Sequence, residues 1–202
     1  MSRQGDTVML VTHDMNLARR VSNRVLYMDE GGVYEDGSPE VIFENPAREK
    51  TRRFVRKLKT LDFRIDSQEF DFIGCNTEMK EFGLKNDIPK GIVLSVMLIF
   101  EGIYSQILLP HFSVFKMRWV VEYSKENETT TITADYSEEP FDITKPGSAE
   151  EDVSGPDRAK ELSMHLIRGL VRDIQWSYTD AAELGNHLSM TVTSAMEVKP
   201  GK

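Results

Sequence analysis

The chain has 202 residues, which is enough for one or two domains with cores of their own. Its 40% hydrophobic and 29% charged residues are typical of a soluble globular protein. The single cysteine, Cys75, excludes an intrachain disulfide and a cysteine-cluster metal site, and it favours a reducing, cytoplasmic compartment.

The net charge of −8 is unevenly distributed along the chain. Residues 1–60 hold 11 Lys and Arg and 9 Asp and Glu, a net charge of +2. Residues 61–202 hold 14 Lys and Arg and 24 Asp and Glu, a net charge of −10. The difference predicts two domains of different origin, 1–60 and 61–202, and it argues against nucleic acid as a partner of the second.

Short strands and helices alternate in the first domain. Strands are expected over three β-rich runs, at 7–12, 24–28 and 33–35. Asp14 and Ser38 are residue types that cap helices, and each precedes a stretch with helical periodicity. Helices are therefore expected at 14–22, from Pro39, and, with a basic face, at 47–59.

The second domain begins after a polar stretch at 60–68 that predicts a junction. Helices are expected at 70–82, 91–110 and 157–172, the last with Leu162, Leu166 and Leu170 facing inward. Strands are expected at 115–123, 129–135, 173–179 and 187–193, with a loop over 135–156. This order predicts an α+β fold: a small αβ segment, then a two-layer sandwich of helices on a mostly antiparallel sheet.

The apolar run 91–110, GIVLSVMLIFEGIYSQILLP, is long enough to cross a bilayer. Glu101, Ser95, Ser105 and Gln106 would be costly in hydrocarbon, and no polybasic flank sets an orientation. A buried helix in a soluble sandwich is therefore the preferred interpretation.

The segments "VTHDM", "MDEGG" and "EDGSPEVIFENP" occur in this order within residues 7–58. In this order they resemble the C-terminal end of ABC transporter ATP-binding subunits of the polar amino acid importer type. The resemblance implies that His13 is the switch histidine, which contacts the γ-phosphate of the nucleotide. Histidine suits that role because it donates a hydrogen bond and titrates near neutrality.

The sequence contains no G-x-x-x-x-G-K-[ST] phosphate loop, no acidic strand end for Mg²⁺ and no signature sequence. This chain alone is therefore not expected to be an enzyme, whereas a longer parent would be an ATP-hydrolysing transporter subunit. The structural alternative is that His13 is an idle histidine.

Residues 66–194 resemble a degenerate ATPase domain of the histidine kinase, gyrase and anti-sigma-factor kinase type. The resemblance is carried by "GIVLSVMLIFEGIYSQIL", "TADYSEEPFDI" and "MHLIRGLVRDIQWSYTDAAELGNHLSMTV". It implies that Glu101 is the general base, that Gln106 holds Mg²⁺ and that Asp135 accepts a hydrogen bond from the adenine amino group. These residue types suit those roles.

Three departures predict that this domain keeps the fold and has lost nucleotide turnover. Gln106 replaces an Asn, Ser137 replaces a Gly, and 160–162 (Lys-Glu-Leu) replace a flexible glycine lid. ATP and Mg²⁺ are possible cofactors by resemblance and are not expected to bind this chain.

Each candidate residue also has a structural interpretation. Glu101 is then a buried or half-buried carboxylate paired with a neighbouring donor, Gln106 a satisfied helix-end amide, and Asp135 a strand-end residue that caps the following turn. His111, His165 and His187 share no ligand spacing, so no metal site is expected.

The leading functional hypothesis is the C-terminal part of an ABC amino acid importer ATP-binding subunit that carries a non-catalytic regulatory or dimerisation domain. The alternatives are an ATP-binding serine kinase-like switch of the anti-sigma type and an inactive fragment of a longer transporter ATPase. The expected partners are another protein or a second copy, and the permease in the full-length parent. The expected location is cytoplasmic, or peripheral at the inner membrane face through the permease. Strands at 8–11 and 25–27 would leave open edges, which predicts strand swapping or dimerisation.

Overall fold

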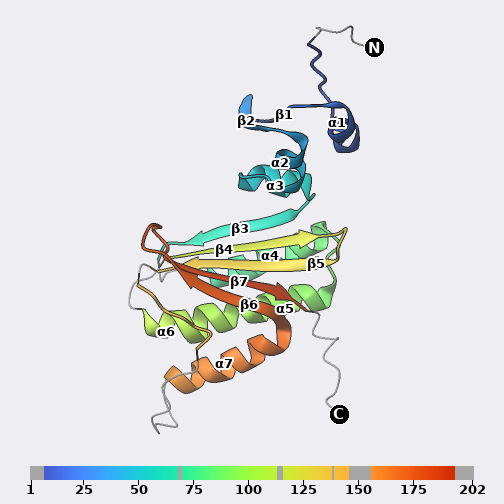
Figure 1. The fold of residues 1–202 in the computed structure, drawn as a ribbon. Helices are drawn as coiled ribbons and strands as arrows, with labels where there is room; N and C mark the ends of the chain where they lie inside the picture. Colours follow the sequence, from blue (N-terminus) through green and yellow to red (C-terminus); the bar gives the residue numbers. More distant parts are fainter. Residues whose placement is uncertain (1–6, 68–69, 113–115, 138, 146–155, 194–202) are drawn as a thin grey trace. The chain divides into compact units, whose positions relative to one another are not determined.

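The computed structural model describes residues 7–67, 70–112, 116–137, 139–145 and 156–193. The chain divides into two compact units, Met1–Leu58 and Lys59–Lys202 (Figure 1). The expected strand start at Phe115 and most of the expected loop between 138 and 155 lie outside the described residues.

The first unit is a two-stranded hairpin with three short helices. In chain order its elements are α1 (Met15–Val21), β1 (Val25–Asp29), β2 (Gly32–Gly37), α2 (Pro39–Glu44) and α3 (Glu49–Val55). Both expected helix caps are confirmed: Asp14 Oδ1 accepts from the N–H groups of Asn16 and Leu17 at 3.0 Å, and Ser38 Oγ accepts from Val41 N–H at 3.4 Å.

The strand expected at 7–12 is wrong, because residues 7–12 have no regular structure and are exposed. A strand needs a neighbour for its backbone hydrogen bonds, and among the described residues β1 and β2 pair only with each other. β-Propensity alone therefore does not order this segment.

A buried carboxylate fixes the start of α3 to β2. Glu35 is buried, and its two carboxylate oxygens accept from Ala47 N–H at 2.7 Å and from Arg48 N–H at 3.2 Å. Burial raises the pKa of the Glu35 carboxyl. The Thr51 side chain, the N–H groups of Ala47 and Arg48 and the Arg48 charge lower it and together outweigh burial, so the pKa lies below its usual value.

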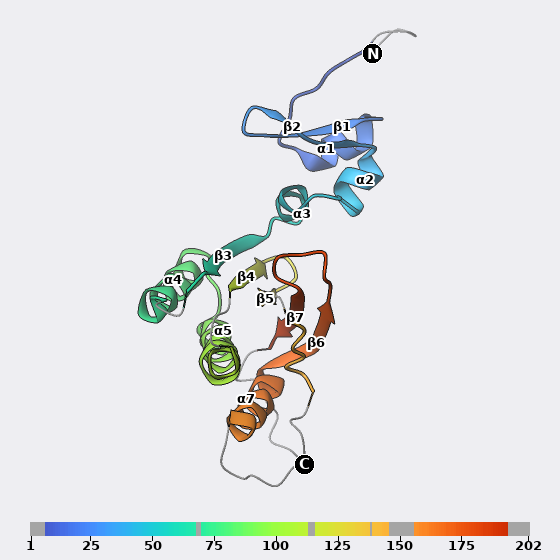
Figure 2. The same ribbon diagram turned by 90° about the vertical axis from the view of Figure 1, so that its left-hand side faces the viewer.

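The second unit is a five-stranded sheet with helices on one face (Figures 1 and 2). The strand order is β3-β4-β5-β7-β6, and every neighbouring pair is antiparallel. The strands are β3 (Lys59–Ile65), β4 (Met117–Ser124), β5 (Thr129–Tyr136), β6 (Val171–Tyr178) and β7 (Asn186–Val192). The helices are α4 (Phe72–Lys85), α5 (Lys90–Glu101), the π-helix η1 (Gly102–Leu108), α6 (Leu109–His111) and α7 (Pro156–Leu170). The α+β expectation is confirmed.

The polar junction expected at 60–68 is wrong, because Lys59–Ile65 is the edge strand β3 of this sheet. The charged residues at 62 and 64 alternate with apolar residues, which is the pattern of a strand with one buried face. Leu61, Phe63 and Ile65 face the core, while Asp62 and Arg64 are exposed on the other face. The helix expected at 47–59 therefore ends early, at Val55.

The core lies between the sheet and the long apolar helix formed by α5 and η1. Ile99, Phe100, Ile103 and Leu108 are fully buried, and the Phe100 ring packs on Trp119 of β4 with a centroid distance of 5.1 Å. The whole helix, Lys90–His111, is long and apolar enough to cross a membrane, yet here it covers a sheet, as the preferred interpretation expects. Within its most apolar window, 44% of the residues are buried.

The expected orientation of α7 is wrong for two of its three leucines. Leu162 and Leu166 are exposed, whereas Ser163, Met164 and Ile167 are buried. The small side chain of Ser163 permits α7 to approach η1, where a Cβ added at Gly102 would lie 3.3 Å from Ile167 Cδ1. Close packing against Gly102 thus selects a different face of α7 from the one that carries these two leucines.

Acidification is expected to loosen the start of α3. Because the pKa of Glu35 is depressed from its ordinary value of 4.5, the carboxylate contributes fully above about pH 4.5 and its contribution is lost as the pH falls through the folded-state value. Glu35→Gln keeps an acceptor but no charge. Amide hydrogen exchange at Ala47 and Arg48 is expected to be roughly fivefold to tenfold faster in this variant than in the wild type at about pH 6. The difference is expected to shrink as the pH falls through the folded-state pKa of Glu35. An identical pH dependence of exchange in the two proteins would contradict this role.

Candidate functional site

Glu101 and Gln106 lie on one side of the central helix because part of that helix is π-helical. Glu101 is the last residue of α5, and Gly102–Leu108 follows as a π-helix. A π-helix bonds each N–H to the carbonyl five residues earlier, so residues five apart lie on successive turns. Gln106 follows Glu101 by five residues, and both are exposed. The two candidates therefore lie about one helical turn apart on the exposed part of this helix.

The expectation that Glu101 is a buried or half-buried carboxylate paired with a donor is wrong. It is exposed, and within the described residues it makes no hydrogen bond or ion pair. Two oxygens, one from Glu101 and one from Gln106, are too few to hold a metal ion unaided. Among the described residues no group of three or more His, Cys, Asp or Glu side chains forms a metal site.

Asp135 is on the opposite side of the sheet from Glu101 and Gln106. Its neighbours on β5, Ala134 and Tyr136, are fully buried under the helices. Because side chains alternate along a strand, Asp135 belongs to the face without helices. The three residues implied by the kinase-type resemblance therefore do not converge.

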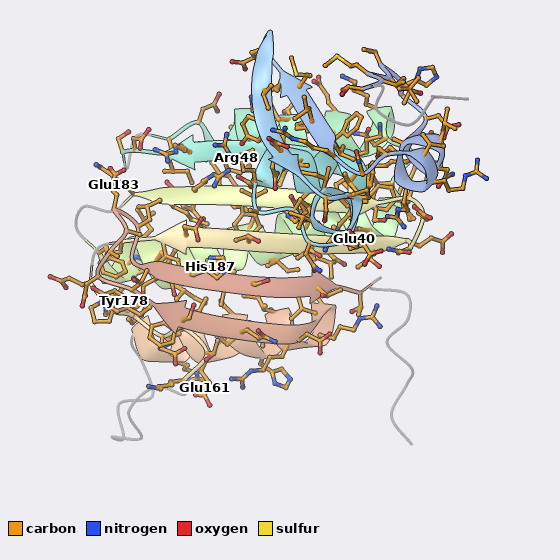
Figure 3. The ribbon with its side chains drawn as sticks, turned by 45° about the horizontal axis from the view of Figure 1, so that its top comes forward. Glu40, Arg48, Glu161, Tyr178, Glu183 and His187 are labelled. Atoms are coloured by element: carbon orange, nitrogen blue, oxygen red, sulfur yellow. The ribbon has the colours of Figure 1, made fainter. Side chains whose placement is uncertain are left out.

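Asp135 pairs with a histidine instead of capping the turn that follows it. Its Oδ1 lies 2.6 Å from Nδ1 of His187, the residue directly opposite on β7. Figure 3 labels His187 on the sheet. Ser177 of β6 is the next residue in this cross-strand row, but it makes no hydrogen bond to His187 in the described part of the chain. The row is therefore a surface Asp–His pair and not a catalytic triad, which needs a nucleophile bonded to its base.

His13 is exposed and lies just before the N-cap of α1, in the first unit. No hydrogen bond or ring contact holds its side chain within the described residues. Asp14 beside it is occupied in capping α1.

Asn186 is a functional candidate that the sequence did not reveal. It is fully buried at the start of β7. Its side-chain N–H donates to the carbonyls of Tyr136 at 2.9 Å and Glu139 at 2.6 Å, and Oδ1 accepts from Phe141 N–H at 2.7 Å. The Trp176 indole N–H also donates to this oxygen, at 3.3 Å. One amide thus fixes the segment that follows β5, and the sequence signal is limited to a Gly-Asn pair before a strand.

The ring of Phe141, in that same segment, is covered by two other elements. His111 of α6 stacks on it with a centroid distance of 3.6 Å and an interplanar angle of 14°, and Lys160 Nζ of α7 lies 4.8 Å from its centroid. The Tyr136 hydroxyl donates to the Phe141 carbonyl at 2.7 Å. These contacts close α7 and α6 onto the segment "PFD" that follows β5 and helps to carry the kinase-type resemblance.

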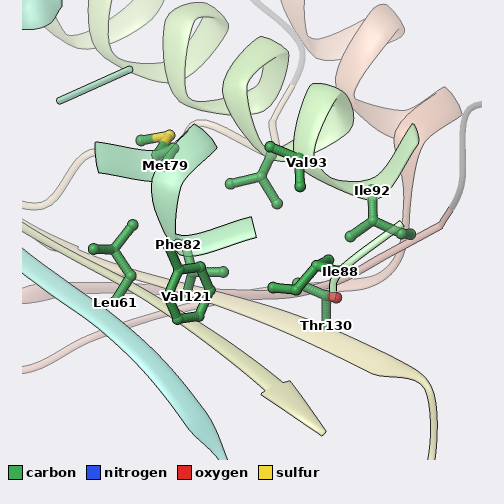
Figure 4. Close-up of a pocket in the computed structure, with 9 residues that line it drawn as sticks. Leu61, Met79, Phe82, Ile88, Ile92, Val93, Val121 and Thr130 are labelled. Atoms are coloured by element: carbon green, nitrogen blue, oxygen red, sulfur yellow. The ribbon is translucent and has the colours of Figure 1, made fainter. Parts of the chain in front are cut away.

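A pocket in the second unit lies between α4, α5 and the sheet (Figure 4). Its lining is apolar except for the Thr130 hydroxyl, and it is formed by Leu61, Met79, Phe82, Ile88, Ile92, Val93, Val96, Val121 and Thr130. Its volume of about 10 Å³ suits one water molecule and excludes a nucleotide. It is a packing defect of the core.

Removing the Asn186 amide is expected to destabilise the second unit. In Asn186→Ala the partly buried N–H groups of Phe141 and Trp176 lose their acceptor, which predicts a loss of about 2–4 kcal/mol in the free energy of unfolding. The matched control is Ser189→Ala on the same strand, expected to change stability by less than about 0.5 kcal/mol. Denaturant unfolding followed by tryptophan fluorescence measures both. Equal stabilities would show that the segment is held by other contacts.

Comparison with known proteins relates part of this chain to amino acid importers. It is 45% identical over 56 residues to the L-cystine import ATP-binding protein TcyN of Bacillus subtilis, covering 28% of this chain and 22% of that protein. It is 40% identical over 58 residues to the glutamate/aspartate import ATP-binding protein GltL of Escherichia coli, covering 29% of this chain and 24% of that protein. It is 32% identical over 90 residues to the methionine import ATP-binding protein MetN of Lactobacillus johnsonii, covering 44% of this chain and 26% of that protein.

The chain thus spans about a quarter of the length of the curated relatives it matches. No family model matches it. The resemblance to ATP-binding subunits of amino acid importers is confirmed over about 28% of the chain, and the kinase-type resemblance of the second unit stays a prediction.

Proposed function

We propose that this chain is the C-terminal part of an ABC amino acid importer ATP-binding subunit, and that its second unit is a non-catalytic regulatory module. The observation that carries the proposal is the 40–45% identity of a segment of 56–58 residues to importer ATP-binding proteins. The rest of the chain folds as a separate compact unit with its own core, as expected of an appended module.

In this proposal the first unit completes a nucleotide-binding domain supplied by the parent. His13 contacts the γ-phosphate there, and its exposure beside the capped start of α1 is consistent with a contact made outside this chain. The parent binds and hydrolyses ATP with Mg²⁺, and it lies at the cytoplasmic face of the membrane through a permease.

The second unit acts through protein contacts and not through nucleotide turnover. Asp135 is separated by the sheet from Glu101 and Gln106, so these side chains cannot hold one nucleotide together in this arrangement. The covered ring of Phe141 and the tethering of its segment by Asn186 support the same conclusion.

A specific observation favours a second candidate, an ATP-binding kinase-like switch. Glu101 directly precedes the π-helix that contains Gln106, and both residues are exposed, which supports a pairing of a base with a metal-holding amide. In this candidate α7 and the 139–145 segment open to admit ATP. Opening must break the stack of His111 on Phe141 and the contact of Lys160 with the same ring.

Calorimetric titration of the whole chain with ATP, with and without Mg²⁺, distinguishes the two. The regulatory proposal predicts no heat and no thermal shift at millimolar ATP. Micromolar binding that is lost in Glu101→Ala, but kept in the exposed control Glu126→Ala between β4 and β5, would establish the kinase-like switch and overturn the proposal. Loss in Asp135→Ala as well would show that the 135 region moves when ATP binds.

The third interpretation, an inactive fragment, is tested by the DNA upstream of the Met1 codon. The proposal predicts an in-frame sequence that encodes a phosphate loop, an acidic strand end and a signature sequence. A stop codon between such a sequence and Met1 would leave the first unit without a nucleotide to contact and would contradict the proposal.

A further inference from the structure

Four leucines are exposed on the helical layer of the second unit. Leu94 and Leu98 of α5 and Leu162 and Leu166 of α7 each have between 45% and 62% of their area exposed. Each pair is spaced i, i+4, so its members lie one above the other on their helix. We call these four residues the leucine surface.

The α7 half of the leucine surface borders the contact between α7 and η1. α5 and α7 lie side by side in both views (Figures 1 and 2), and Ser163 and Ile167 of α7 approach Gly102 at 3.8 and 3.3 Å from the position of an added Cβ. Leu162 and Leu166 each precede one of these α7 residues. Met164, on the other flank of Ser163, is buried, so Leu162 and Leu166 occupy the flank away from the core.

Charged residues stand at both ends of the leucines on α5. Lys90, Leu94, Leu98 and Glu101 are spaced i, i+4, i+8 and i+11, and all four are exposed, so they form one stripe along the helix. Within the described residues neither Lys90 nor Glu101 makes an ion pair or hydrogen bond. The stripe is therefore positive at one end, apolar in the middle and negative at the other end.

Such a stripe is complementary to itself when two copies run antiparallel. A two-fold axis midway between Leu94 and Leu98 places Leu94 of one copy against Leu98 of the other. With a rise of about 1.5 Å per residue, Lys90 lies about 9 Å from the axis and Glu101 about 7.5 Å on the other side. The lysine of each copy therefore meets the glutamate of the other within about one residue of register. An interface in which the same patch meets itself is what two-fold symmetry requires.

We propose that a second copy of this chain docks on the leucine surface, with α5 of one protomer antiparallel to α5 of the other and Lys90 paired with Glu101 across the axis. This inference rests on the proposed role of the second unit as an interaction module. It places self-association on the helical layer and not on the strands of the first unit.

The charges argue for a second copy over a lipid surface. Residues 61–202 carry a net charge of −10, which repels anionic headgroups, and the stripe offers one lysine to a membrane. A glutamate beside the leucines is unfavourable in a bilayer interface and favourable opposite a lysine. Self-pairing uses both charges.

The test is the molar mass of the whole chain, measured by sedimentation equilibrium over a range of concentrations. The wild type is expected to form a dimer, and Leu98→Glu is expected to weaken dimerisation at least about tenfold. The matched control is Val33→Glu, an exposed valine of β2 in the first unit, which is expected to leave the mass unchanged. Circular dichroism confirms that both variants remain folded.

A charge exchange tests the antiparallel register. Lys90→Glu and Glu101→Lys are each expected to weaken the dimer, because each places like charges opposite one another, and the double variant is expected to restore it. A structural role of either residue within its own protomer would not produce this rescue.

Four outcomes would overturn the inference: a monomeric wild type, a mass unaffected by Leu98→Glu, dissociation by Val33→Glu, or binding of the monomer to anionic vesicles through Leu98. None of these results decides whether ATP binds, which the calorimetric titration measures separately.

Discussion

The second unit depends on the burial of one face of its central helix against the sheet. Ile99, Phe100 and Ile103 have no exposed area and contact strands that lie far apart in the sequence, including β4 and β5. Burying side chains of this size contributes roughly 1.5–3 kcal/mol each, which is large beside the net stability of a domain. The edge strand β3 pairs with this sheet, and the helices α4 and α7 pack against this central helix. The contact between the sheet and the central helix therefore positions all three elements.

The same arrangement limits what chemistry the second unit can perform. A sheet covered by helices on one face gives every strand a covered side and an open side, and adjacent residues of a strand belong to different sides. Asp135 lies on the open side while Tyr136 is buried on the covered side. A site that combines a carboxylate of β5 with groups of the helical layer would need that carboxylate one position along the strand, on the covered side. Asp135 lies on the open side and pairs with His187 there.

Sequence reasoning identified most elements, and its errors have physical causes. The caps at Asp14 and Ser38 were predictable because the signal is local, and so was the α+β order of elements. Strand β3 was missed because Asp62 and Arg64 made an alternating strand look like a polar linker. The strand at 7–12 was overpredicted because its propensity is local but its hydrogen bonds would have to come from elsewhere. The face of α7 was misassigned because a small residue, Ser163, decides the packing against Gly102.

The candidate site was less predictable than the fold. Exposure of Glu101, burial of Asn186 and the cover on Phe141 depend on contacts between residues far apart in sequence. The side on which Gln106 lies depends on whether a helical turn is α or π, and composition does not distinguish these. A five-residue spacing in a π-helix and a four-residue spacing in an α-helix place two side chains equivalently. Deleting one residue from this π-helical turn would leave a regular α-helix that buries the same apolar face, so the fold can tolerate a change of length here. A deletion elsewhere along the helix would rotate every following residue by about 100° and expose part of the apolar face.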